Sequence, residues 1–190
     1  SILTKRKKEL HDKIGQAVEE LSKDNINEHY ELLEGHYIAS ENYEKAAGYS
    51  KLSAKKAEKI ASLNDAITYA KKRIASIEKL PRTDDMEKDL IDARAILGLY
   101  MSQQGSFAEA KKVIDPIFEL ALKYNNKRRL SQLYTIVGTY NNFVEEDYLG
   151  ASKHLERALK ISEEVNDTLS LVFANLWLGL VLVTNNEFEN

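Results

Sequence analysis

The sequence has no cysteine and few of the residues that interrupt helices. Its 190 residues include only two prolines and eight glycines. The absence of cysteine excludes a disulfide framework and any CxxC motif. The scarcity of proline and glycine argues against a sheet protein rich in tight turns. Leucine, alanine, lysine and glutamate are abundant instead, so the composition predicts an all-α protein built from long helices.

The charge balance and the hydropathy argue against two classes of partner. The chain has 27 basic and 30 acidic residues and a net charge of -3, so charge provides no general attraction for nucleic acid. The local excess at Lys5–Lys8 is expected to be a solvated helical turn. The most apolar stretch, residues 169–183, is interrupted by Ser170 and Asn175. It is shorter than the roughly 20 residues of a membrane span, so we expect a buried helix and no membrane segment.

A helical hairpin is predicted over residues 94–122. Leu97 and Gly98 lie in the middle of its first helix, Gly105 breaks the periodicity, and Ala110 opens the apolar face of a second helix. This order of small and large residues resembles the tetratricopeptide (TPR) repeat. The resemblance implies an α-α superhelix of antiparallel hairpins, which binds a partner and carries no chemistry of its own.

Glycines recur at equivalent places along the chain. Gly98, Gly138 and Gly179 are 40 and 41 residues apart (138 minus 98 and 179 minus 138). A glycine inside a helix costs about 1 kcal/mol relative to alanine, so its recurrence predicts a neighbouring helix packed against bare backbone. Adding Gly15 and Ala54 extends the series into one continuous register of four and a half hairpins.

Nine helices are predicted at intervals of about 20 residues. They cover about residues 4–21, 27–40, 43–61, 64–79, 84–103, 107–124, 126–144, 148–165 and 168–184. Thr4 is expected to cap the first helix and Asp167 the ninth, and an enlarged turn is expected around residues 145–147. A rival register pairs the second and third helices, with Glu34 in the place of the glycine, and requires a slip near Pro81.

We interpret residues 1–190 as a single helical repeat domain. N-terminal helices cover residues 1–80, and regular hairpins cover residues 83–190, with the last repeat truncated. The chain begins with Ser1 and contains no initiator methionine and no signal-peptide pattern. We therefore expect a fragment of a larger cytoplasmic protein.

No motif of a catalytic or cofactor site is present. The sequence lacks a Gly-rich phosphate loop, HExxH and GxSxG. His29 and His36 lie on one face of a predicted helix, but the spacing supplies no third metal ligand. We expect no enzyme activity, no cofactor and no metal in this chain.

The inner face of a superhelix of this kind is lined by the first helix of each hairpin. The residues three before, one after and four after each small residue share that face. They predict a partner-binding groove lined by Leu99, Ser102, Thr135, Thr139, Asn142, Leu176 and Leu180. The lining passes from charged residues near Lys51 to apolar ones, and it lacks the basic set with which chaperone-binding TPR domains hold a carboxylate.

The ninth helix is expected to leave one face uncovered. By the spacing of 12 between Gly98 and Ala110, the next small residue would fall at position 191. We predict self-association, with a homodimer formed through Trp177, Leu178 and Leu182. A monomer at high concentration would count against this prediction.

The first 80 residues carry a more specific resemblance. The runs LHDKIGQAVEEL, NINEHYELLEGHYIASENYEKAAGYSKLSAKKA and NDAITYAKKRIASIEKLP are similar to segments of bacterial multidomain signalling ATPases and adenylate or guanylate cyclases that end in a TPR array. The resemblance implies a regulatory arm that binds a protein segment. Two alternatives are a small-ligand sensor, resembling bacterial maltose-type regulators, and an architectural oligomerisation module.

Overall fold

The computed structural model describes residues 2–188, with side chains up to Thr184, and this part of the chain contains helices and no strand. The all-α fold class expected from the sequence is confirmed. The chain divides into two compact units, Ser1–Ala93 and Arg94–Asn190. The division falls inside α5, and each unit is described by itself.

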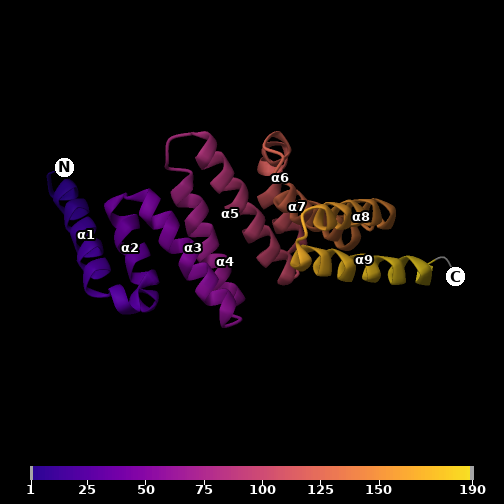
Figure 1. Ribbon diagram of the computed structural model, residues 1–190, viewed down its shortest axis with the longest axis horizontal. Coiled ribbons are helices and arrows are strands. Elements are labelled where there is room, and N and C mark those ends of the chain that lie inside the picture. The colour runs from indigo at the N-terminus through magenta and orange to yellow at the C-terminus, as the bar shows by residue number, and fades with distance from the viewer. Residues whose placement is uncertain (1, 189–190) are drawn as a thin grey trace. The chain divides into compact units, whose positions relative to one another are not determined.

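Unit 1 is a series of antiparallel helices in which α1 to α4 each pack against the next. It contains α1 (Ile2–Leu21), η1 (Lys23–Glu28), α2 (Tyr30–Ser40), α3 (Tyr43–Lys59), α4 (Leu63–Ile77) and the first half of α5 (Asp84–Gln103). Figure 1 shows α1 to α4 standing side by side. Its core includes Leu33, Tyr37 and Ala46, on which Val18 and Tyr49 pack.

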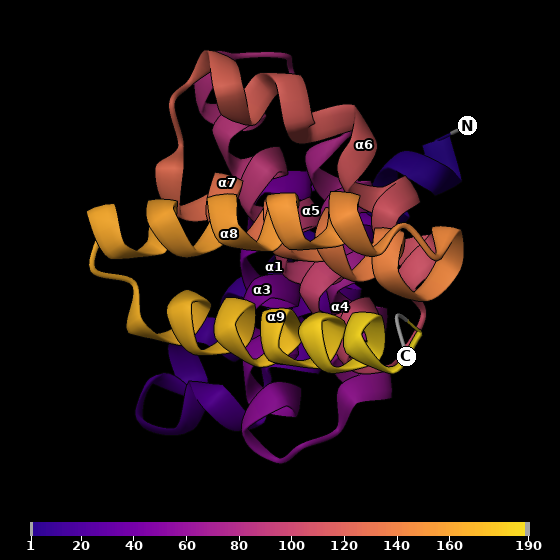
Figure 2. The same cartoon turned by 90° about the vertical axis from the view of Figure 1, so that its right-hand side faces the viewer.

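Unit 2 repeats the same arrangement. It contains the rest of α5, then α6 (Phe107–Lys123), α7 (Lys127–Tyr140), η2 (Asn141–Glu145), α8 (Tyr148–Glu164) and α9 (Thr168–Phe188). Figure 2 shows α8 and α9 lying antiparallel, and the two helices are in contact along their length. Ala151, Leu155 and Val181 form the core between them.

The packed glycines support the continuous register. A Cβ on Gly98 would lie 2.8 Å from Ile114 Cγ2 of α6, and one on Gly138 would lie 2.7 Å from Leu155 Cγ of α8. In both places an odd-numbered helix brings bare backbone against the helix that follows it, as the recurrence of glycine predicted. Gly179 is different because nothing lies within 4 Å of its Cβ position.

The predicted helix bounds agree with the structure to within a few residues, with three corrections. α1 already includes Ile2, so Thr4 lies inside the helix and is not its cap. α2 begins at Tyr30 because a short 3-10 helix, η1, occupies the expected first turn. The enlarged turn expected at residues 145–147 follows a π-helical turn, η2, and begins with Glu146 in the left-handed region at φ 56°. The predicted cap of α9 is confirmed, since Asp167 Oδ1 accepts from the Ser170 N–H at 3.4 Å.

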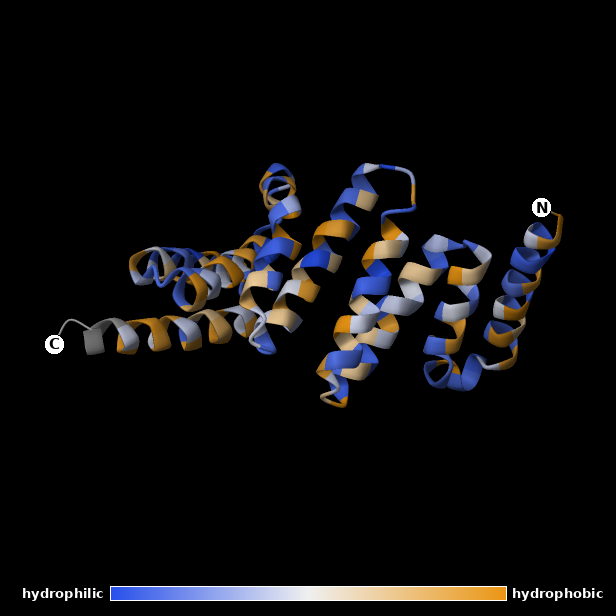
Figure 3. Cartoon of the chain, turned by 180° about the vertical axis from the view of Figure 1, so that it is seen from behind, coloured by the Kyte–Doolittle hydropathy of each residue, from blue (hydrophilic) through white to orange (hydrophobic). Residues whose placement is uncertain are grey.

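On most helices the apolar residues form a stripe along one side. Figure 3 shows orange and blue alternating along α1, and orange alternating with paler segments along α9. Within residues 2–188, none of the helices combines the length and the hydropathy that crossing a membrane requires.

Candidate functional site

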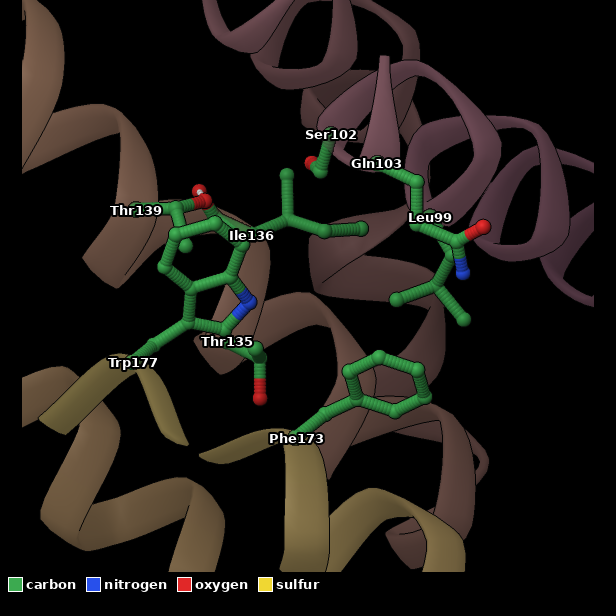
Figure 4. Close-up of a pocket in the computed structure, with 8 residues that line it drawn as sticks. All are labelled: Leu99, Ser102, Gln103, Thr135, Ile136, Thr139, Phe173 and Trp177. Carbon is green, nitrogen blue, oxygen red and sulfur yellow. Dashed lines mark hydrogen bonds between the residues drawn. The ribbon is translucent and has the colours of Figure 1, made fainter. Parts of the chain in front are cut away.

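The inner residues predicted on α5 and α7 come together in unit 2. Leu99, Ser102, Thr135 and Thr139 line a cavity of about 20 Å³, and Gln103, Ile136, Phe173 and Trp177 complete its wall (Figure 4). We call this cavity the niche. A volume of this size accommodates about one water molecule or the tip of one small side chain.

One hydroxyl in the lining of the niche is left unpaired by the fold. Ser102 is 6% exposed, and within the described part of the chain its Oγ has no hydrogen-bond partner. The hydroxyls of Thr135 and Thr139 donate to carbonyl oxygens of their own helix at 3.1 and 2.9 Å, which leaves their lone pairs as acceptors. A buried unpaired hydroxyl costs about 1–3 kcal/mol, so a polar group that enters the niche would remove this cost.

The wall on the α9 side is rigid because three aromatic rings pack together. Trp177 lies edge-to-face with Phe107 at 5.9 Å and with Phe143 at 5.6 Å, while Phe107 and Phe143 stack at 4.5 Å. Such edge-to-face pairs fix ring orientation as well as burying area. In Figure 4 the indole nitrogen of Trp177 is turned toward the inside of the niche.

The other predicted groove residues lie outside the niche. Asn142 is 6% exposed, belongs to η2 and has an Oδ1 with no partner in the described residues. Leu176 and Leu180 are exposed on α9. The niche is completed by Phe173 and Trp177 instead, which the glycine-based register did not indicate. The face of α9 that lines the niche follows from the face that α8 covers, and no local sequence signal indicates this.

A continuous apolar stripe runs along the outer side of α9. It consists of the exposed residues Leu169, Val172, Leu176, Leu180 and Val183, which recur every three or four residues. We call this set the α9 stripe. Gly179 lies beside it with an open Cβ position. The stripe therefore faces away from α8, and no described helix covers it.

The predicted self-association face is partly covered in the structure. Trp177 and Leu178 are partly buried and pack against the core formed by Ala151, Leu155 and Val181. Leu182 is 49% exposed, but it lies about a third of a turn away from the α9 stripe. α8 packs on the side of α9 that carries Trp177 and Leu178. The uncovered face of α9 is therefore the α9 stripe.

Unit 1 contains a buried carboxylate, that of Glu34, and a pair of histidines in contact, His11 and His36. Glu34 is fully buried, Lys72 Nζ donates to its Oε1 at 2.6 Å, and burial raises the pKa of its carboxyl. His36 meets His11 of α1, with 3.0 Å between the two Nδ1 atoms. His29 stands at the start of α2 and is not part of this pair. Nowhere in the described residues do three or more potential metal ligands converge.

Comparison with known proteins adds no family to this description. A scan against protein-family models found no match, and a search of curated proteins found no significant relative. The TPR resemblance and its link to signalling enzymes stay predictions. The niche and the α9 stripe are therefore the features of unit 2 that bear on function.

Proposed function

We propose that this chain is a non-catalytic scaffold that binds a segment of a protein partner across α5, α7 and α9 of unit 2. The observation that carries the proposal is the buried, unpaired Ser102 hydroxyl in the lining of a niche walled by Phe173 and Trp177. A bound segment would place one polar atom or small side chain in the niche and lay apolar groups against the aromatic wall. With about 20 Å³, the niche supports recognition of a peptide better than enclosure of a metabolite.

The sequence resemblance extends this proposal to the parent molecule. Under it, the chain is a TPR-type regulatory arm of a cytoplasmic bacterial signalling ATPase or nucleotide cyclase. Binding of the segment would then control an enzyme that is carried elsewhere in the same polypeptide. The resemblance supports this part of the proposal, and the niche supports only the binding.

Trp177 provides a direct test because it is the only tryptophan in the chain. Peptides selected from a random display library on this protein should change the indole fluorescence saturably. Thr139→Arg, which fills the niche, should remove binding, and Ser102→Ala should weaken it by about tenfold, as expected for loss of one buried hydrogen bond.

The control is a matched substitution on an exposed helical surface. Thr68→Arg in α4 introduces the same side chain away from the niche and should leave peptide affinity unchanged. Circular dichroism would establish that the variants are folded. If folded Thr139→Arg protein captured the selected peptides normally, the niche would not be the binding site.

A second candidate function is favoured by the α9 stripe. On α5 and α7 the mid-helix glycine is covered by the next helix, whereas Gly179 and the stripe beside it have no such cover among the described helices. We propose self-association through this stripe. The stripe adjoins the niche, because Phe173 lies seven residues before Leu180 and so on nearly the same face of α9.

A further inference from the structure

A second cavity in unit 2 is larger than the niche and lies among other side chains. It has a volume of about 260 Å³ and is formed where α6 ends, α7 begins and the second half of α8 passes. Leu122, Leu130 and Ile161 provide its apolar lining. We call it the α6–α8 cleft. Its volume suits a small organic molecule, whereas that of the niche does not.

The rim of the α6–α8 cleft is positively charged. Lys127, Arg157, Lys160 and Glu164 line it, so three cations and one anion give a side-chain charge of +2. Glu164 is already engaged, since Lys127 Nζ donates to it at 3.0 Å. Arg157 and Lys160 form no ion pair in the part of the chain that the structure describes.

Two further observations describe a positive field at this place. The first turn of α7 contains no acidic residue, although a helix N-terminus is itself positive, and its Lys127 and Arg128 are paired with Glu164 and Asp167. The pKa of Glu164 is lowered by the hydrogen bond from Lys127, with smaller contributions from Lys160 and Arg157. The positive charges of Arg157 and Lys160 therefore act on the anion at the cleft, and they would act on a ligand there.

Arg157 is also held in place. Its guanidinium lies over the ring of Tyr134 at 5.2 Å from the centroid, and Tyr134 packs edge-to-face on Phe118 at 5.2 Å. A stacked guanidinium loses less conformational freedom on binding an anion than a free side chain does. Lys160, three residues further along α8, supplies a second cation at a helical neighbour position.

We propose that the α6–α8 cleft binds a small amphipathic anion. Its carboxylate or phosphate lies between Arg157 and Lys160, and its apolar body lies on Leu122, Leu130 and Ile161. Lys127 and Glu164 form the ion pair that closes one side of the cleft. This site is independent of the proposed peptide groove, because no residue lines both cavities.

The test uses three probes that separate charge from apolar body, with binding followed by amide chemical shifts of the whole chain. Hexanoate has both features, inorganic phosphate has only the negative charge, and hexylammonium has the apolar body with the opposite charge. Hexanoate should shift amides of residues 122–130 and 157–164 saturably, and phosphate should shift the same amides more weakly. Hexylammonium should leave these amides unchanged.

Variants then assign the charge. Lys160→Gln and Arg157→Gln should each weaken hexanoate binding by about tenfold, as expected for loss of one charge-assisted hydrogen bond. The matched control is Lys112→Gln, an exposed lysine of α6 that does not line the cleft and should bind hexanoate like the unchanged protein. Because Arg157 stacks on Tyr134, Lys160→Gln is the variant that tests charge without altering an aromatic contact.

Three results would overturn the proposal. Hexylammonium binding as tightly as hexanoate would show that the cleft recognises only the apolar body of the ligand. Equal weakening of hexanoate binding by Lys112→Gln and Lys160→Gln would show that only the net charge of the protein matters. The third is the absence of saturable shifts up to about 20 mM hexanoate, the affinity range expected of so small a ligand.

Discussion

At the scale of single residues, two glycines at equivalent helical positions have opposite surroundings. A Cβ on Gly138 would lie 2.7 Å from Leu155 Cγ and 3.2 Å from the Ala151 carbonyl oxygen of α8. A Cβ on Gly179 would meet nothing within 4 Å. The same substitution should therefore have opposite effects on stability.

Gly138→Ala should lower the free energy of unfolding by about 1–3 kcal/mol, because α8 must shift to admit the methyl group. Gly179→Ala should raise it by about 0.5–1 kcal/mol through helix propensity alone. Urea denaturation of both variants, with unchanged m-values, measures this difference. A stabilised Gly138→Ala protein would mean that α7 and α8 are not packed as closely as described.

Glu34 is a residue whose environment opposes its charge. Burial raises its pKa above 4.5, so the charged form is disfavoured in the folded state. Its partner Lys72 is 45% exposed and can return to water if the ion pair is lost. We expect Glu34→Gln to raise the unfolding free energy at pH 7 by up to about 1 kcal/mol.

The effect of Glu34→Gln should depend on pH in a defined direction. A carboxyl whose pKa is higher in the folded than in the unfolded state destabilises the protein above both values, and protonation relieves this. The advantage of the glutamine should therefore shrink as the pH falls from 7 toward 4.5. Glu156→Gln is the control, since Glu156 is exposed on α8 of unit 2. An advantage that grows toward acid would contradict the assignment.

At the scale of elements, the contact between α1 and α2 depends on a histidine pair. The Nδ1 atoms of His11 and His36 are 3.0 Å apart, so one ring donates and the other accepts. If both rings are protonated, no acceptor remains and the two charges repel. Around this pair α1 and α2 are joined by Lys8 and Glu41 at 2.6 Å, and Asn42 donates to Asp12 at 3.1 Å.

This pair should make the docking of α1 sensitive to mild acid. Burial, and then the charge of His11, lower the pKa of His36 below 6.5. A histidine with a lowered folded-state pKa imposes no cost above the unfolded value, and stability is lost as the pH falls through about 6.5 and below. His36→Asn should therefore reduce the loss of unfolding free energy between pH 7.5 and pH 5.5.

The control for the histidine pair is His29→Asn at the start of the same helix. Half-buried His154 of unit 2, whose pKa is also lowered by burial, is present in both variants and contributes equally. Urea denaturation at the two pH values gives the comparison. An identical pH dependence in His36→Asn and His29→Asn proteins would show that the pair does not control the docking of α1.

The elements themselves were largely predictable because their ends carry local signals. Asn42, Asp147 and Asp167 each accept a hydrogen bond from a backbone N–H of the helix that follows. The π-helical turn η2 was not predictable as such, because it coincides with the packing of Phe143 on distant Phe107 and Trp177. The niche is lined by four of the residues that the periodicity assigned to a common face, Leu99, Ser102, Thr135 and Thr139. The periodicity did not indicate Phe173 and Trp177, because contact with α8 determines which residues of α9 turn inward.

At the scale of the whole molecule, the α9 stripe is an exposed apolar surface that a second copy of the chain could bury. Five apolar residues at helical spacing are exposed along one side of a helix of 21 residues. Burying one such side chain contributes about 1.5–3 kcal/mol, so pairing two stripes overcomes the cost of association if most of them are covered. Two copies related by a twofold axis would bring the same stripe against itself.

Self-association through the α9 stripe is testable by sedimentation velocity over a range of about 10 to 500 μM, where a modest helix-pair interface should show dimer. Leu180→Glu should weaken dimerisation by about tenfold or more, because a carboxylate would be buried without a partner. Leu182→Glu, off the stripe, and Leu149→Glu, 71% exposed on α8, should dimerise like the unchanged protein. Thr139→Arg should also dimerise normally, which separates assembly from peptide binding. A protein that stays monomeric throughout this range, or one for which Leu182→Glu has the larger effect, would exclude the stripe as the interface.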